Sequence, residues 1–179
     1  MYVCGVTVYD YCHVGHARAA IVFDTFYRYF QYLGYDVNFV RNFTDIDDKI
    51  INRANEEGID WQEVNRKYIA AFYEDMGQLN IASPTEEPKA TDHIPEMLDM
   101  IQSLVDQDKA YESEGDVFYS IKSFKDYGCL SGKNNDDLQS GARVEVNETK
   151  RNPLDFALWK KSKPGEPFWD SPWGPGRPG

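Results

Sequence analysis

Two histidines three residues apart carry the strongest chemical signal in this sequence. His13 and His16 enclose Val14 and Gly15, and they stand between a predicted strand and a long predicted helix. The free N–H groups and the positive dipole end of a helix N-terminus favour bound phosphate. Two imidazoles placed there can donate hydrogen bonds to phosphoryl oxygens and stabilise the charge that develops as pyrophosphate leaves. Gly15 lets a flat base or ribose approach the backbone. We therefore predict a phosphate-binding, catalytic turn at His13, Gly15 and His16, with a pair of surface histidines as the alternative.

Cys4 follows the first predicted strand, at the sheet edge where ligands bind in open α/β folds. A thiolate at this edge is a candidate zinc ligand, since cysteine and histidine hold zinc in four-coordinate sites. A buried cysteine that fills apolar space is the alternative. A single site made of Cys4, Cys12, His13 and His16 is disfavoured, because it would withdraw both histidines from phosphate.

A polar segment, residues 44–49 (TDIDDK), follows the second predicted strand. Thr44 or Asp45 is suited to cap the helix that comes next. The hydroxyl and the carboxylates could also hold an ammonium group or ribose hydroxyls at the same sheet edge. Capping is the favoured interpretation from the segment alone, and a substrate contact is compatible with it.

A strand, a helix and a second strand must position these residues. Residues 1–4 predict the first strand, and apolar residues at spacings of three and four predict a helix over 19–33 that stops at Gly34. Residues 37–40 predict the second strand. This order begins a βαβ unit and therefore predicts an α/β fold with a parallel sheet.

The rest of the chain contains further helices and strands before a proline- and glycine-rich tail. Proline blocks helices and ladders, so the tail, residues 164–179, is predicted to be a loop, and its two tryptophans need a surface to pack on. Residues 134–150 are polar and predicted to be irregular. The other predicted elements are helices over 46–55, 61–79 and 91–107, a hairpin over 110–121, and a strand over 154–159.

Composition excludes several classes of protein. The 179 residues suffice for one domain or one domain with an insertion, and the hydrophobic fraction of 41% supports a packed core. No apolar run is long enough to span a membrane. Three cysteines without a CxxC pair favour a reducing, cytoplasmic location over a disulfide framework. A net charge of 19 − 30 = −11 argues against autonomous nucleic-acid binding.

Segments spread along the whole chain resemble the cysteinyl-tRNA synthetase family of class I aminoacyl-tRNA synthetases. They are residues 1–16 (MYVCGVTVYDYCHVGH), 41–50 (RNFTDIDDKI), 150–160 (KRNPLDFALWK) and 171–179 (SPWGPGRPG). Val14 stands where the family often has isoleucine, and this apolar exchange puts little in doubt. The segments occur in the family's order, which is far more specific than the HxGH tetrapeptide alone.

The resemblance implies a Rossmann-type catalytic domain split by a connective insertion. Residues 1–83 would form its first half, residues 84–150 the insertion, and residues 151–179 a return to the catalytic domain. The family's other zinc ligands, its KMSKS loop and its anticodon-binding region would lie beyond residue 179. The resemblance therefore implies an incomplete chain that is inactive by itself, with an exposed sheet edge and an uncovered apolar face.

The resemblance also implies site roles. Cys4 would bind Zn²⁺, and that metal would bind the thiolate of substrate cysteine, which distinguishes cysteine from serine. Gly5, Thr44 and Asp47 would line the cysteine pocket. ATP, with Mg²⁺, would bind at the histidine turn, and tRNA(Cys) would be the second substrate.

Three other interpretations are open at this point. A small HxGH nucleotidyltransferase of the pantetheine-phosphate type predicts a second phosphate-binding motif, rich in serine, threonine and arginine, in the last third of the chain. A mycothiol-pathway cysteine ligase would activate cysteine by the same chemistry and pass it to an amino sugar. A nucleotide-binding module without catalysis would bind ATP and would not exchange pyrophosphate.

Overall fold

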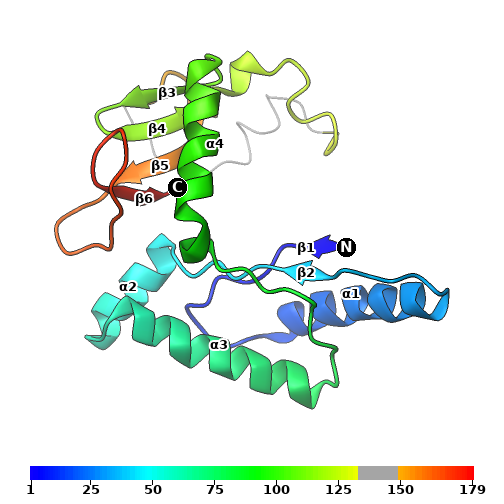
Figure 1. Cartoon of the computed structure of the whole chain (residues 1–179). Helices are drawn as coiled ribbons and strands as arrows, with labels where there is room; N and C mark the ends of the chain where they lie inside the picture. The colour runs from blue at the N-terminus through cyan, green and yellow to red at the C-terminus, as the bar shows by residue number, and fades with distance from the viewer. Residues whose placement is uncertain (133–148) are drawn as a thin grey trace. The chain divides into compact units, whose positions relative to one another are not determined.

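The computed structural model describes residues 1–132 and 149–179, which divide into two compact units, Met1–His93 and Ile94–Gly179 (Figure 1). The predicted irregular segment 134–150 lies outside the described residues except at its last two positions. The helices are α1 Val14–Tyr32, α2 Asp48–Glu57, α3 Trp61–Gln78 and α4 Ile94–Asp106, with short 3₁₀ turns η1 Ala90–His93 and η2 Ile121–Ser123. The strands are β1 Tyr2–Val3, β2 Val40–Arg41, β3 Ala110–Ser113, β4 Asp116–Tyr119, β5 Phe156–Lys161 and β6 Gly176–Pro178.

The first unit is built on a parallel pair of strands. β1 pairs with β2, with Tyr2 opposite Val40, and α1 connects the two strands. A parallel bridge between Thr7 and Thr44 extends the pairing, and another between Phe43 and Lys89 adds a third extended segment. The predicted α/β fold with parallel strands is therefore confirmed. The second strand begins at Val40 and not at residue 37, and the Val40 amide donates to the Met1 carbonyl at 2.8 Å.

The end of α1 is set by Gly34, as predicted. Gly34 has a φ of +87°, which glycine adopts without strain. The Gly34 amide donates to the Gln31 carbonyl at 2.9 Å, and the Tyr35 amide donates to the Phe30 carbonyl at 3.1 Å. This is the Schellman pattern, and the Phe30 and Tyr35 rings meet edge to face across it, with their centroids 6.0 Å apart.

The core of the first unit is formed by α2 and α3 against the strand region. Its buried members are Val8, Phe43, Ile50, Ala54, Val64, Tyr68, Phe72 and Met76. No residue of α1 is fully buried, although the helix is rich in aromatic and aliphatic side chains. Its exposed apolar residues are Val14, Ile21, Val22, Phe23, Phe26, Tyr29, Phe30 and Tyr32. α1 is therefore largely exposed, and the uncovered apolar face expected of the half sheet stays a prediction.

The second unit is an antiparallel sheet of order β3-β4-β5-β6 covered by α4, which lies across the strands (Figure 1). Ile94 and Ile101 of α4 share a buried cluster with Ala110, Val117 and Trp159 of the sheet. The predicted α4 helix and β3-β4 hairpin are confirmed. None of the helices in the described residues has the length and hydropathy that crossing a membrane requires.

The tail differs from the predicted loop. Residues 176–178 form β6, which pairs antiparallel with β5, with Arg177 opposite Lys160. Pro178 is tolerated there because β6 is an edge strand of the sheet. Trp169 and Trp173 pack against the core of this same unit. The assignment of residues 151–179 to the catalytic domain stays a prediction.

Buried polar contacts fix the start of β5. Asp155 is 2% exposed; its carboxylate accepts hydrogen bonds from the Tyr111 hydroxyl at 2.7 Å and from the Ile121 amide at 3.0 Å. The Tyr111 hydroxyl in turn accepts from the Arg151 amide at 2.7 Å. Because Asp155 is used in this way, the strand begins at Phe156, two residues later than the predicted start at residue 154.

Replacing Tyr111 with phenylalanine should therefore destabilise the second unit. The change leaves one carboxylate oxygen of Asp155 and the Arg151 amide without a partner, a loss of about 1–3 kcal/mol in the free energy of unfolding. Urea denaturation followed by circular dichroism measures it. Tyr119→Phe, on β4, is the matched control, and an equal loss in both variants would contradict this role for the Tyr111 hydroxyl.

Candidate active site

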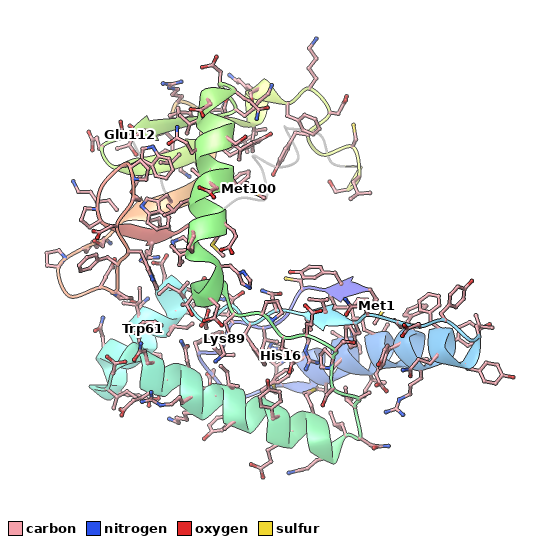
Figure 2. All side chains as sticks on the ribbon, viewed as in Figure 1. Met1, His16, Trp61, Lys89, Met100 and Glu112 are labelled. Atoms are coloured by element: carbon pink, nitrogen blue, oxygen red, sulfur yellow. The ribbon has the colours of Figure 1, made fainter. Side chains whose placement is uncertain are left out.

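The two histidines form a capping box at the start of α1. His13 is the N-cap residue, with φ −120° and ψ 170°, and its Nδ1 atom accepts a hydrogen bond from the Gly15 amide at 3.0 Å. The Nδ1 atom of His16 accepts from the His13 amide at 3.2 Å. The two rings stack with centroids 3.9 Å apart at an interplanar angle of 27°. His16 is labelled in Figure 2, near the start of α1. The cap explains why α1 begins at Val14, earlier than the predicted residue 19.

Gly15 is required by this cap. A Cβ atom at position 15 would lie 2.8 Å from Cε1 and 2.9 Å from Nδ1 of the His13 ring. Contacts that short force one of the groups to move. The glycine therefore makes room for the His13 imidazole; the predicted approach of a base or ribose to Gly15 stays a prediction.

The electrostatics of the pair favour an uncharged His16. Partial burial lowers the pKa of His16 below its usual value, and the neighbouring His13 lowers it further. His13 is the more exposed of the two rings. At neutral pH the turn therefore offers a neutral imidazole at position 16.

The loop between β1 and α1 is held by residues that the sequence patterns did not indicate. The Arg53 guanidinium, from α2, contacts the Asp10 carboxylate at 2.8 Å and donates to the Tyr9 carbonyl at 3.2 Å. The Tyr11 ring meets the Tyr68 ring edge to face, with centroids 5.2 Å apart. Arg53 has only one local signal, its position four residues before Glu57, and that spacing points to a helix-surface ion pair.

Gly5 follows β1 and packs directly against the backbone of Asn42. Its amide donates to the side-chain oxygen of Asn42 at 2.8 Å, and the Tyr2 hydroxyl donates to the same oxygen at 3.0 Å. A Cβ atom at position 5 would lie 1.5 Å from the Asn42 carbonyl oxygen. The structure thus gives Gly5 a packing role, and its predicted contact with cysteine is untested.

Cys4 is exposed just after β1 and is not part of a ligand cluster. Across residues 1–132 and 149–179, no three histidine, cysteine or acidic side chains gather as a metal site would need. A four-residue site with Cys12, His13 and His16 is therefore absent from this part of the chain. Burial and nearby Asp75 raise the pKa of the Cys12 thiol, in line with a packing role. The described residues alone do not form a zinc site.

In the acidic segment after β2, residues 44–49, the residue that caps α2 differs from the prediction. Asp47, not Thr44 or Asp45, caps α2: its carboxylate accepts from the Lys49 amide at 2.8 Å. Asp45 is 4% exposed, and its two oxygens accept from the Thr91 amide at 3.0 Å and the Thr91 hydroxyl at 2.6 Å. The capping prediction is wrong because Asp45 is engaged by Thr91 and the Thr44 backbone belongs to the ladder.

The ladder brings part of the predicted site together. The Thr44 amide donates to the Val6 carbonyl at 3.0 Å, so Thr44 lies beside the segment that follows Cys4 and Gly5. Among the residues described, no hydrogen bond or ion pair joins the histidines to Cys4, Thr44 or Asp47. The histidine turn is linked to Cys4 and Thr44 through the backbone of residues 6–12. That segment contacts Arg53 of α2 and Tyr68 of α3.

Replacing Gly5 with alanine should weaken the pairing of the first two strands. The new methyl group would overlap the Asn42 carbonyl, which is backbone and cannot rotate away. Overpacking of this kind costs about 1–3 kcal/mol in the free energy of unfolding, measurable by urea denaturation. Gly77→Ala is the control: it has open space within α3 and should gain about 0.5–1 kcal/mol. Equal effects of the two changes would show that the close approach is not constraining.

The pKa of His16, measured by an NMR titration of its ring, should lie below the usual value of about 6.5. The unfolded chain then binds more protons than the folded chain in the interval between the two pKa values. Stability from this group is complete above about pH 6.5 and falls as the pH drops through the folded-state pKa. His16→Gln keeps a capping acceptor and removes the titration, so that its stability should depend less on pH. An elevated His16 pKa would contradict this sign.

A protein-family model and several curated proteins match this chain along its whole length. The family model described as tRNA synthetases class I (C) catalytic domain matches residues 1–179. Similar curated proteins include the Cysteine--tRNA ligase of Pelobacter propionicus, 64% identical over 179 residues, covering 100% of this chain and 36% of the relative. The proteins of the same name from Trichlorobacter lovleyi and Desulfotalea psychrophila are 62% and 63% identical, again over 100% of this chain and 37% of each relative. The chain thus spans little more than a third of the length of these relatives.

Proposed function

Because this chain belongs to the family of class I (C) tRNA synthetase catalytic domains, we propose that it is part of a cysteine--tRNA ligase. The observation that carries the proposal is the identity of 64% along the whole chain to a relative of that name. The family resemblance given by the separate sequence segments is confirmed. The names of the relatives favour a tRNA ligase over a sugar ligase, and the family match favours it over a pantetheine-phosphate nucleotidyltransferase.

The proposed reaction has two steps. A carboxylate oxygen of cysteine attacks the α-phosphorus of ATP, and pyrophosphate leaves as cysteinyl-adenylate forms. A ribose hydroxyl at the 3′ end of tRNA(Cys) then attacks the cysteinyl carbonyl carbon, and AMP leaves. In the first step negative charge grows on phosphoryl oxygens, so fixed N–H donors are the groups needed.

His13 and His16 are the proposed donors. Each uses its Nδ1 atom within the capping box, which leaves the Nε2 atom of each ring for substrate. The helix N-terminus adds a favourable field for phosphate. Gly15 supports the geometry of the turn and, in this proposal, also the approach of ATP.

Gly5, Thr44 and Asp47 are the proposed residues of the cysteine pocket. The Thr44 hydroxyl and the Asp47 carboxylate can bind an ammonium group, and Asp47 keeps one oxygen for that purpose while the other caps α2. Thr44 is only partly buried, so its side chain is accessible to a ligand.

Cys4 is proposed as one ligand of a zinc ion whose other ligands come from the rest of the ligase. Zinc would supply a preference for a thiolate over a hydroxyl. The described residues do not form that site by themselves. ATP would bind with Mg²⁺, as phosphate substrates commonly do.

The proposed partner is tRNA(Cys), with most of its binding surface in the rest of the ligase. The charge of −11 on this chain opposes the attraction between lysine or arginine side chains and phosphate. The three cysteines are free thiols, which supports the proposed cytoplasmic location.

A chimera tests this proposal. This chain would replace the matching 179 residues of the Pelobacter propionicus relative, and cysteine-dependent ATP–pyrophosphate exchange would be measured, with serine and no amino acid as controls. We expect exchange with cysteine only. His16→Ala in the chimera should lower the exchange rate by about 10²–10³, the usual cost of losing one oxyanion donor.

Val14→Ala is the matched control for that variant, because Val14 is adjacent in the motif and 84% exposed; it should keep the rate of the chimera. A folded chimera without cysteine-dependent exchange would overturn the proposed function. An unchanged rate in His16→Ala would remove His16 from the mechanism.

A further inference from the structure

The capping box determines where the protons sit on the two imidazoles. A ring nitrogen that accepts a hydrogen bond from an N–H group carries no proton. Nδ1 of His13 accepts from the Gly15 amide, and Nδ1 of His16 accepts from the His13 amide. In the neutral state the single ring proton of each histidine must then lie on Nε2.

Each cap contact requires an Nδ1 atom without a proton. An imidazolium has protons on both nitrogens, so its Nδ1–H would face a backbone N–H across about the same 3 Å and two donors would oppose each other. If both rings were charged, their stacking, with centroids 3.9 Å apart, would also place two like charges in contact. The lowered pKa of His16 agrees with this geometry.

The spacing of the HxGH motif matches the positions of a capping box. In the common form of this box, serine or threonine is the N-cap residue and glutamate or glutamine occupies the third helical position. Here His13 and His16 take those two positions. The imidazole at the N-cap is larger than a hydroxyl, and the ring occupies the space where a side chain at position 15 would begin.

We propose that the capping box locks His13 and His16 as neutral Nε2–H tautomers, and that Gly15 is the positioning residue that admits the His13 ring. Among the described residues, neither Nε2 atom takes part in a hydrogen bond. Both N–H groups are therefore available as uncharged donors, fixed in direction before substrate arrives. The statement that these donors serve phosphoryl oxygens rests on the proposed function; the tautomers and the role of Gly15 do not.

NMR of this chain with ¹⁵N-labelled histidine tests the tautomers directly, in the absence of ATP and at about pH 8, where histidine is neutral. The sequence has three histidines, and single variants assign them. We expect separate Nδ1 and Nε2 signals for His13 and His16, at the unprotonated and protonated ends of the range, and a scalar coupling from the Gly15 amide to Nδ1 of His13. Averaged signals, or a proton on Nδ1, in the folded chain would overturn the proposal.

A double-mutant cycle tests Gly15. Gly15→Ala should destabilise the chain and abolish the coupling to His13, whereas Val14→Ala should preserve it. In the background of His13→Asn, which retains an N-cap side chain without the ring, Gly15→Ala should lose most of its effect. If Gly15→Ala fails to fold, recovery of folding by His13→Asn gives the same result. An undiminished effect in that background would show that the ring does not require glycine.

The outcomes separate this inference from the proposed function. If this chain has fixed Nε2–H tautomers and the chimera shows no cysteine-dependent exchange, the inference stands and the proposed function is wrong. Cysteine-dependent exchange in the chimera together with averaged tautomers in this chain would support the proposed function and overturn the inference.

Discussion

The parallel pairing of residues 2–8 with residues 40–44 is the constraint on which the first unit depends. A parallel pair needs a crossover connection, and α1 is that connection. The helix must therefore begin near the carboxyl end of the first strand, beside the residues that follow the second. The close approach at Gly5 permits the pairing, because any side chain there would overlap the Asn42 carbonyl. The pairing also places the Thr44 backbone beside residues 6–8, ahead of the histidine turn.

Several polar residues of the first unit use only one of their polar side-chain atoms in structural hydrogen bonds. Each histidine uses its Nδ1 atom to complete the helix N-terminus, and its Nε2 atom takes part in no hydrogen bond among the described residues. Asp47 caps α2 through one carboxylate oxygen. Asp45 has no such spare atom, because Thr91 engages both of its oxygens in the interior. Asp45 thus holds the segment in place through Thr91.

The exposed apolar face of α1 distinguishes this helix from the other long helix of the first unit. α3 contributes Val64, Tyr68, Phe72 and Met76 to the core, whereas α1 has no fully buried residue. An apolar surface of this kind is normally covered in a stable protein. Its presence agrees with a chain that spans 36% of a 64% identical relative.

Patterns local in the sequence were sufficient to determine the strand–helix–strand order, the end of α1 at Gly34 and the histidine turn, because each depends on residues within a few positions of one another. The tertiary structure decided which distant residues contact and hold these segments. Arg53 reaches back to Asp10, and Thr91 reaches Asp45; neither pair has a local signal. β6 forms despite its proline because β5 offers it an edge. Long-range partners of this kind are invisible to periodicity, since a hydrogen bond acts between atoms that only the folded chain brings together.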